Sequence, residues 1–481
     1  MKIAQEELVS VLAQFNPWWQ GESSSELALW KRNAYKELKN WILDPPAARA
    51  VMISGARQVG KTTLMLQAIK ELIELNVPAS NILYATFDHP LLKLAGIDAV
   101  IEAWKLREPK ADGPEYLFLD EAQFIYEWGT WVKHQVDFFK SRKIIFTGST
   151  MPLVQLHQES GVGRWHTIRL TTLSFYEYIQ IKKLDLPIFP EIKNLSELFS
   201  WPNAKFLKMA DLASSYIAHF HEYILRGGFP QTALVNSISQ AQKMLREDIV
   251  DKILKRDMTA LFGVRRILDL EHTFLYLCMH DGGILDIPTL CTNLEVKRPT
   301  AQNFIELLES THLIYRLQPF GYGKEILRGK AKIYLSDAAI PPAILLKGKE
   351  FIDNPLSLSI AAESTLLKHL LTLRNNNNIH FSYSRNNKDL EVDFIAETEG
   401  KIIPFEVKYI AQKTKPRDIK GLLELCTRKN IDKAYVVTKS LNDFGLMKLP
   451  ENSPTQILCI PCAILCYFIG KMEIDGRSFA D

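Results

Sequence analysis

The stretch "GARQVGKT", residues 55–62, decides the fold of this chain, because it fits the pattern G-x-x-x-x-G-K-[ST]. An apolar run, "ARAVMIS" (48–54), precedes it, and a helical pattern, "TTLMLQAIKELIELN" (62–76), follows it. The two glycines permit a tight loop whose backbone amides point inward at a phosphate group. The following helix directs the positive end of its dipole at the same anion. The stretch therefore predicts a phosphate-binding loop between a strand and a helix.

The ligand expected at this loop is ATP with Mg²⁺. Lys61 is long enough to reach the β- and γ-phosphates, and the hydroxyl of Thr62 is a candidate ligand of the metal. A glycine turn with an accidental lysine is the alternative, and the flanking strand and helix disfavour it. The loop residues expected to bind the nucleotide are Gly55, Ala56, Arg57, Gln58, Val59, Gly60, Lys61, Thr62 and Thr63.

A second motif, "YLFLDEAQ" (116–123), supplies the acidic partner of the loop. Four apolar residues bring Asp120 to the carboxyl end of a strand, where ligands bind in parallel sheets. Asp120 is expected in the Mg²⁺ shell, and Glu121 is expected to position or activate the attacking water. An acidic helix cap is the alternative.

Two further polar residues are candidates for the same site. The stretch "KIIFTGST" (143–150) delivers Ser149 to the next strand end, within reach of the γ-phosphate. Arg164, in "SGVGRW", is a candidate arginine finger, although a solvated surface arginine fits the pattern equally well. If Arg164 acts on a neighbouring copy, the protein forms a homo-oligomer.

Short apolar runs recur through the first part of the chain, at 82–88, 115–120 and 143–150, and each ends in polar residues. Helical stretches lie between them. This alternation predicts a parallel sheet covered on both faces by helices.

Bulk composition limits the class of protein. At 481 residues the chain exceeds what one core usually supports, so several domains are expected. With 58 basic and 55 acidic residues the net charge is +3, so any nucleic-acid surface must be local. Six cysteines without a regular framework indicate a reducing compartment, and the amino terminus shows no cleavage signal. We therefore expect a cytoplasmic protein.

The longest apolar run, "ILCIPCAILCYFI" (457–469), has 13 residues and a proline, which is too short to span a bilayer. No membrane association is therefore expected. Its three cysteines, Cys459, Cys462 and Cys466, lack a nearby histidine and have apolar neighbours. They are interpreted as small core residues rather than metal ligands.

The middle of the chain, residues 265–318, gives three short helical segments and then an apolar run, which suits a winged helix. In "KRPTAQNFIELLES" (297–310), four apolar residues share one helical face. The polar residues at its beginning or on its other side would face a DNA groove. A winged helix used only for packing remains an equal alternative. The apolar face holds Ala301, Phe304, Ile305 and Leu308; the polar residues are Lys297, Arg298, Gln302 and Asn303; and a basic hairpin tip adds Lys324, Arg328, Lys330 and Lys332.

The stretch "EVDFIAETEGKIIPFEVKYI" (391–410) predicts a hairpin with a two-residue turn at Glu399-Gly400. Antiparallel pairing from that turn sets Thr398 opposite Lys401 and Phe394 opposite Phe405. It also sets Asp393 opposite Glu406, with Cβ atoms about 4.5–5.5 Å apart. Two carboxylates at that distance repel, and a divalent cation such as Mg²⁺ removes the repulsion.

The acidic pair is expected to belong to a larger centre. Lys408 falls on the same face as Glu406, and Glu363 sits near the start of the preceding helix. Glu363, Asp393 and Glu406 are candidate metal ligands, and Glu406 and Lys408 are candidate catalytic residues for metal-assisted phosphodiester hydrolysis. The set resembles the D…E-x-K centre of restriction-type nucleases. A solvated charged face without catalysis is the alternative.

Several motifs occur together in a fixed order, and this order makes a family resemblance specific. They are "SGARQVGKTTL", "FLDEAQ", "FTGST", "GR" before "LTTLSFYEY", "RGGFPQ" and "FEVKY". The chain, over roughly residues 25–475, resembles a prokaryotic family of AAA-type ATPases with a carboxy-terminal domain of unknown function that is nuclease-like in fold. The chain departs from the family in a spacer at 185–206 and in Thr172, where the family usually has proline.

The resemblance implies an α/β protein with a P-loop AAA-type core, a helical and winged-helix middle, and a restriction-endonuclease-like end domain. We expect an ATPase that engages DNA and whose end domain is a candidate Mg²⁺-dependent nuclease. The alternative is a nucleotide-dependent switch that gates a partner protein, with a silent end domain. The expected parts are an amino-terminal helical lead (1–46), the ATPase core (47–180), a helical lid and spacer (181–260), the winged helix (261–345) and the nuclease-like domain (355–481).

Overall fold

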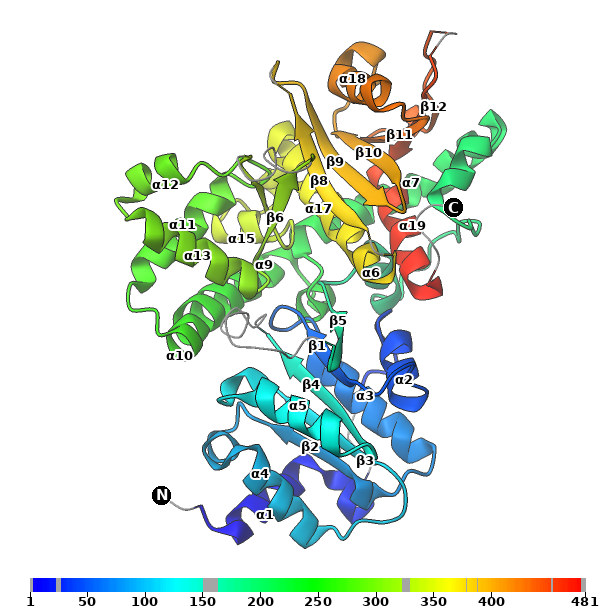
Figure 1. Cartoon of the computed structure of the whole chain (residues 1–481). Coiled ribbons are helices and arrows are strands. Elements are labelled where there is room, and N and C mark those ends of the chain that lie inside the picture. The colour runs from blue at the N-terminus through cyan, green and yellow to red at the C-terminus, as the bar shows by residue number, and fades with distance from the viewer. Residues whose placement is uncertain are drawn as a thin grey trace. The chain divides into compact units, whose positions relative to one another are not determined.

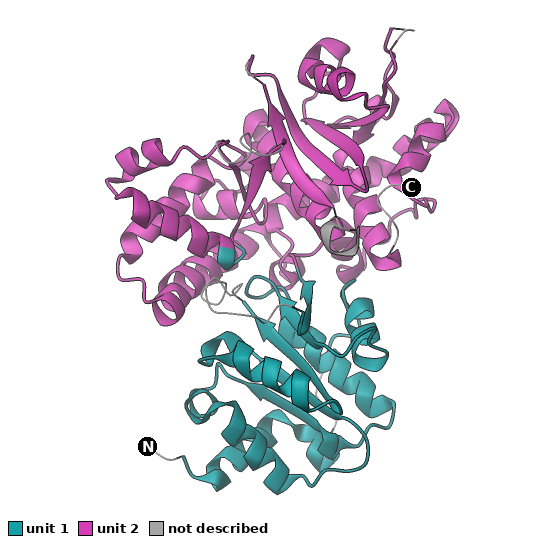
Figure 2. Cartoon of the chain, in the orientation of Figure 1, with its two compact units in different colours: residues 1–170, 310–312 teal, residues 171–309, 313–481 magenta. Residues whose placement is uncertain are grey.

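The structure is a computed structural model, and it describes residues 3–22, 27–149, 163–321, 329–377, 379–386, 388–450 and 453–476 (Figure 1). The chain divides into two compact units, coloured teal and magenta in Figure 2. The first comprises Met1–Leu170 with Ser310–His312, and the second comprises Thr171–Glu309 with Leu313–Asp481. No helix among these described ranges is long and apolar enough to cross a membrane.

The first unit is built on a five-stranded sheet in which neighbouring strands pair in parallel. This confirms the parallel sheet predicted from the alternating apolar runs. Every residue of β3 is buried, as expected for a strand covered on both faces. The strands, in spatial order, are β2 (Ile82–Thr86), β3 (Glu115–Asp120), β4 (Arg142–Gly148), β1 (Ala50–Ser54) and β5 (Trp165–Arg169).

Helices that precede the first strand or connect the strands complete the first unit. Buried residues of α1, α4 and α5 share one apolar core with the sheet. The helix after β1 begins at Lys61, so the phosphate-loop motif ends on the first turn of a helix, as predicted. The helices are α1 (Gln5–Phe15), α2 (Tyr35–Leu43), α3 (Lys61–Glu74), α4 (Pro90–Arg107) and α5 (Trp128–Phe138).

The second unit contains a mixed eight-stranded sheet (Figure 1). Its central hairpin is the one predicted at 391–410. The strands, in spatial order, are β12 (Gly445–Leu446), β13 (Gln456–Pro461), β11 (Lys433–Thr438), β10 (Lys401–Lys408), β9 (Glu391–Thr398), β8 (His380–Arg385), β6 (Ile314–Pro319) and β7 (Lys332–Leu335).

Helices make up the rest of the second unit. A capping box between Ser174 and Glu177 fixes the start of the first of them, after the "LTTLSF" motif. The helices are α6 (Phe175–Ile181), α7 (Asn203–Arg226), α8 (Pro230–Leu234), α9 (Ile238–Arg246), the π-helix Glu247–Asp257, α10 (Met258–Phe262), α11 (Ile267–Met279), α12 (Ile287–Leu294), α13 (Arg298–Ser310), α15 (Ile340–Ile344), α16 (Glu350–Asp353), α17 (Pro355–Asn377), α18 (Lys420–Lys429) and α19 (Cys462–Asp475).

Three helices and two strands of the middle region share one apolar core. The helices α11, α12 and α13 precede β6 and β7, which pair antiparallel. The face of α13 predicted to be apolar is buried, with Phe304 and Leu308 at 3% and 0% exposure. β6 also pairs with β8, so the same sheet continues into the end region. The segment 347–357 holds α16 and the first residues of α17.

The β9–β10 hairpin has the predicted register, because Thr398 pairs with Lys401 and Phe394 with Phe405. Regular alternation along β9 predicts that Val392 and Phe394 share one face, and this is wrong. The pairing of β8 with β9 shifts between Ser382 and Ser384, which is a β-bulge. The bulge changes the alternation, so Val392 packs in the core that contains Ile395, while the ring of Phe394 contacts Tyr334.

The spacer at 185–206 packs by aromatic contacts against the end region. Phe189 lies 4.7 Å from Tyr467 between ring centroids, and Phe199 lies 5.2 Å from Tyr435. Trp201 contacts Phe468. The three cysteines of the apolar run are free and buried, as their interpretation as core residues predicted.

Candidate functional site

The loop between β1 and α3 has the backbone that the motif predicted. Gly60 has a φ of 97°, in the left-handed region that favours glycine. At Gly55 a Cβ atom would lie 2.2 Å from the carbonyl oxygen of Leu170, so no side chain fits there. Both glycines are therefore required for the loop to take this path.

Lys61 lies against the loop and is only 4% exposed. Its Nζ donates hydrogen bonds to the carbonyl oxygens of Gly55 and Ala56, at 2.9 and 2.8 Å. The ammonium group is thus held at the loop itself. It supplies a positive charge beside the amino terminus of α3, where an anion is stabilised.

Asp120 and Thr62 meet at the carboxyl end of β3. The Thr62 hydroxyl donates to Asp120 Oδ2 at 2.7 Å, and the Tyr84 hydroxyl donates to the same oxygen at 2.9 Å. The hydroxyl of Thr147 donates to the other carboxylate oxygen. A hydroxyl beside a carboxylate at the phosphate loop is a donor set that suits Mg²⁺, so these residues fit the metal.

Glu121 and Ser149 are joined by a residue that was not singled out from the sequence. Gln123 donates to Ser149 Oγ at 2.9 Å and also to Glu121 Oε2. The backbone N–H of Glu121 donates to Thr147 Oγ1 at 2.8 Å. Gln123 thus holds the candidate base at the end of the same sheet. Gln123 could have been found from the sequence, because it lies three residues after Asp120 in the motif "YLFLDEAQ".

The structure does not bring Arg164 to the phosphate loop. Its carbonyl oxygen accepts from the N–H of Ala50, at the start of β1, and its side chain pairs with Asp137 at 3.1 Å. β1 ends at Ser54, so the loop begins roughly 13 Å further along the strand. Arg169 is the β5 residue paired with Ser54, at the loop's end of the sheet. The position of Arg169 could not be predicted from the sequence, because it depends on where β5 ends.

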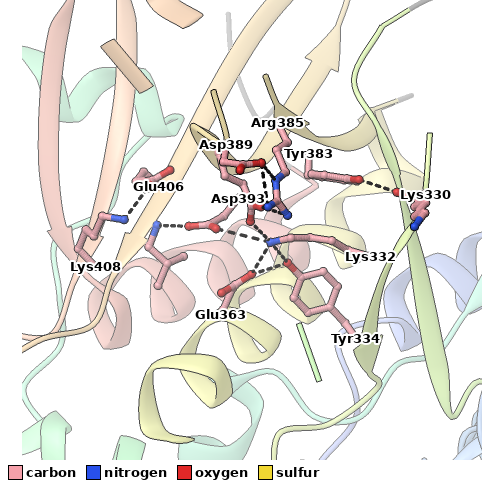
Figure 3. A network of polar contacts seen from close by, with 12 residues as sticks. Lys330, Lys332, Tyr334, Glu363, Tyr383, Arg385, Asp389, Asp393, Glu406 and Lys408 are labelled. Carbon is pink, nitrogen blue, oxygen red and sulfur yellow. Dashed lines mark hydrogen bonds and ion pairs between the residues drawn. The ribbon is translucent and has the colours of Figure 1, made fainter. Parts of the chain in front are cut away.

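The residues predicted for the end-domain centre come together from three elements (Figure 3). Glu363 lies on α17, Asp393 on β9, and Glu406 and Lys408 on β10. Lys408 Nζ donates to Glu406 Oε1 at 2.6 Å, and Asp393 Oδ2 accepts from the N–H of Val407 at 2.7 Å. The structure thus juxtaposes the four residues predicted from the hairpin and the preceding helix.

A fifth residue, Lys332 of β7, lies among these carboxylates. It was predicted as part of a basic hairpin tip beside the recognition helix, but it is only 4% exposed and its side chain lies in the acidic cluster instead. Its Nζ lies 3.3 Å from Glu363 Oε1 and 3.8 Å from Asp393 Oδ1, and it also contacts Glu391. The hydroxyl of Tyr334 donates to Glu363 in the same network (Figure 3).

Burial and charge shift the protonation of this cluster. Burial raises the pKa of Glu363, and the charge of Asp393 raises it further. Burial likewise raises the pKa of Glu406, whose Oε2 has no hydrogen-bond partner. Burial alone would lower the pKa of Lys332, but the surrounding carboxylates raise it. The ammonium form of Lys332 is therefore favoured, and several carboxyl groups share it as a partner.

The end-domain residues do not fit a divalent metal as they lie. An ammonium group stands between the carboxylates that the metal would need, and like charges this close repel. Among the parts of the chain that the structure describes, no group of three or more His, Cys, Asp or Glu side chains is arranged to hold a metal ion.

The residues predicted to face DNA divide into two groups. Lys297, Arg298, Gln302 and Asn303 are exposed at the start and along the outer side of α13. Lys330 is exposed and pairs with Asp286. The other two members of the predicted basic tip, Lys324 and Arg328, lie outside the described residues.

Comparison with known families divides the chain into three matched segments. Residues 47–179 match an AAA domain, residues 217–350 a domain of unknown function (DUF8612), and residues 360–462 another domain of unknown function (DUF4143). The AAA match coincides with the parallel sheet, the phosphate loop and the Thr62–Asp120 pair. Residues 47–179 are therefore similar to an AAA domain, and most of this segment lies in the first unit.

Relatives extend over most of the chain at low identity. An uncharacterized protein of Methanocaldococcus jannaschii is 23% identical over 417 residues, which are 85% of each chain. An uncharacterized protein of Haemophilus influenzae is 26% identical over 60% of this chain and 66% of its own length. An uncharacterized protein of Mycobacterium tuberculosis is 24% identical over 78% of this chain and 74% of its own.

Solved structures resemble parts of the chain weakly. The Orc1 protein of Aeropyrum pernix in complex with DNA is 12% identical, with a TM-score of 0.29, over 66% of this chain and 93% of its own. AMPPCP-bound DnaA of Aquifex aeolicus is 14% identical, with a TM-score of 0.26, over 59% of this chain and 89% of its own. Likenesses of this strength do not establish function.

Proposed function

We propose that this protein binds ATP with Mg²⁺ at the loop 55–62, hydrolyses the ATP, and engages DNA. The observation that carries the first part is the hydrogen bond between Thr62 and Asp120, placed beside a lysine at the amino terminus of α3. Mg²⁺ bound there would neutralise charge on the β- and γ-phosphates. Lys61 and the loop amides hold the same phosphates, and Glu121 accepts a proton from the attacking water.

The hydrolysis proposal predicts that a Glu121→Gln change separates binding from turnover. The variant keeps the shape of the side chain but loses the base, so turnover should fall by about 10²–10⁴-fold. Binding of a fluorescent ATP analogue should stay as in the wild type, and the two measurements are made on the same samples. Turnover equal to that of the wild type would remove Glu121 from the mechanism.

The DNA proposal rests on α11–α13 with β6 and β7, which we propose to be a winged helix. The exposed Arg298 begins α13 and the exposed Lys297 precedes it, at the end of the helix that such folds present to a groove. The exposed amides of Gln302 and Asn303 follow on the outer side of the same helix. Phosphate contacts from the two cations would make DNA binding salt-dependent.

Replacing both Lys297 and Arg298 with alanine should weaken DNA binding and flatten its salt dependence. Each lost phosphate contact should reduce the slope of log K against log salt by about 0.9. Fluorescence anisotropy with a labelled duplex at several salt concentrations measures both. Lys208→Ala, at an exposed position of α7, is the control. Unchanged affinity and slope would favour a winged helix used only for packing.

A second candidate function is a nucleotide-dependent switch whose end domain is a silent binding module. We propose that residues 355–481 have a nuclease-like fold, and the position of Lys332 favours the silent form over metal-dependent cleavage. ATP turnover that is slow and unaffected by DNA would favour the switch, which would then gate a partner protein. Turnover stimulated by DNA would favour the first proposal.

A further inference from the structure

Lys332 is held in the acidic cluster by a complete set of contacts. A lysine ammonium has three N–H donors. Three acceptors surround it: Glu363 Oε1 at 3.3 Å, the Tyr334 hydroxyl at 3.3 Å and Glu391 Oε1. The Tyr334 hydroxyl donates a hydrogen bond to Glu363, so its oxygen is available to accept a hydrogen bond from the lysine. The ammonium group is thus fully satisfied without water.

The backbone of Lys332 is fixed as firmly as its side chain. It is the first residue of β7 and pairs with Leu317 of β6. On its other side it forms a bridge with Ile284. The main chain at Lys332 is therefore held on both sides, and the ammonium group is held by the three acceptors around it. Together these contacts argue for a permanent occupant of the cluster.

Electrostatics explains why an occupant is needed. Glu363, Asp393 and Glu406 are buried or nearly so, and an ionised carboxylate without a partner is strongly disfavoured in such surroundings. Lys408 compensates Glu406 through one oxygen. Lys332 supplies a further positive charge from a different part of the chain (Figure 3). Arg385 lies at the edge of the cluster, 3.9 Å from Glu391 Oε2.

We propose that Lys332 is the resident cation of the cluster formed by Glu363, Glu391 and Asp393, and that it excludes divalent metal from it. A metal ion would need the Glu363 and Asp393 oxygens that face the ammonium group, and it would meet a positive charge within a few ångströms. The end region consequently does not cleave phosphodiesters by a metal-assisted route while β7 is in place. This goes beyond the proposed ATP hydrolysis and does not depend on it.

The test is a calorimetric titration of Mn²⁺ alone into the full chain, with four proteins compared. They are the wild type, Asp393→Asn, Lys332→Met, and the Lys332→Met/Asp393→Asn double variant. The wild type and Asp393→Asn should give the same isotherm, because Asp393 binds no metal in the wild type and its removal therefore changes nothing. Lys332→Met should gain a saturable site, and the double variant should lose it again. Weak Mn²⁺ binding at other places, including the phosphate loop, should be the same in all four proteins and therefore does not affect the comparison.

Two results would overturn the proposal. One is a Mn²⁺ site in the wild type that Asp393→Asn removes, since the metal would then bind beside the lysine. The other is a folded Lys332→Met protein that gains no site. If Lys332→Met does not fold, Lys332→Arg keeps the positive charge and should exclude Mn²⁺ as the wild type does. The comparison of the wild type with Asp393→Asn needs no change at Lys332.

Discussion

A Lys61→Ala variant should not bind ATP. The ammonium group is the charged donor of the loop, and it lies 2.8–2.9 Å from two loop carbonyl oxygens at the amino terminus of α3. Without it the phosphates lose their counter-charge and the carbonyls lose a donor. Ligand at 100 times its dissociation constant stabilises a protein by about 2.7 kcal/mol. Wild-type protein should therefore melt at a higher temperature with ATP and Mg²⁺, and Lys61→Ala should not.

The control for this experiment lies on the same helix. Lys70 is 43% exposed and its ion pair with Glu74 spans 4.0 Å, so Lys70→Ala should keep the full ATP-dependent shift. Circular dichroism without nucleotide establishes that both variants are folded. If Lys61→Ala bound ATP as tightly as the wild type, the assignment of residues 55–62 as the phosphate loop would be wrong.

A Lys368→Met variant should lose about 3–5 kcal/mol of stability, the usual cost of breaking a buried ion pair. Lys368 Nζ lies 3.0 Å from Asp337 Oδ2, and the two side chains are 3% and 2% exposed. The same carboxylate accepts from the Thr172 hydroxyl at 2.7 Å and from the N–H of Gly228 at 2.9 Å. Burial alone would raise the pKa of Asp337, but Lys368 and these donors lower it. Methionine would leave that charge uncompensated.

Urea unfolding of the full chain, followed by circular dichroism and tryptophan fluorescence, measures this loss. Two compact units need not unfold together, so the transition of the second unit must be identified by both probes. Lys255→Met is the matched control. It removes an exposed pair with Asp251 and should leave the unfolding transition almost unchanged. Equal costs for the two variants would show that the Asp337–Lys368 pair is not the stabilising contact we describe.

The parts of the fold that were predicted from the sequence depend on local patterns, namely apolar runs and a two-residue turn. Each strand of the first unit predicted from sequence is an apolar run that ends at a polar residue, and β3 has the predicted bounds. The register of β9 with β10 followed from the turn at Glu399-Gly400, because a two-residue turn leaves one pairing. Asp120 was placed by counting apolar residues along one strand.

Contacts between segments that are far apart in the sequence could not be predicted. In the sequence Lys332 is one of several basic residues in a row, and only the pairing of β6 with β7 turns it inward. Thr172 departs from the family pattern, and its use became clear only beside Asp337, 165 positions away. No glycine or proline in β9 indicates the bulge at the sequence level. The place of Arg164 depends on the strand ends around it.

The pairing of β6 with β8 has a practical meaning for anyone who divides this protein. Gln318 and Pro319 of β6 lie beside Ser382 and Tyr383 of β8, so the sheet does not stop at residue 355. A fragment that began there would expose unpaired amides and carbonyls along β8, and such an edge recruits other chains into aggregates. Truncation between the two neighbouring family matches is therefore a poor way to obtain a well-behaved piece.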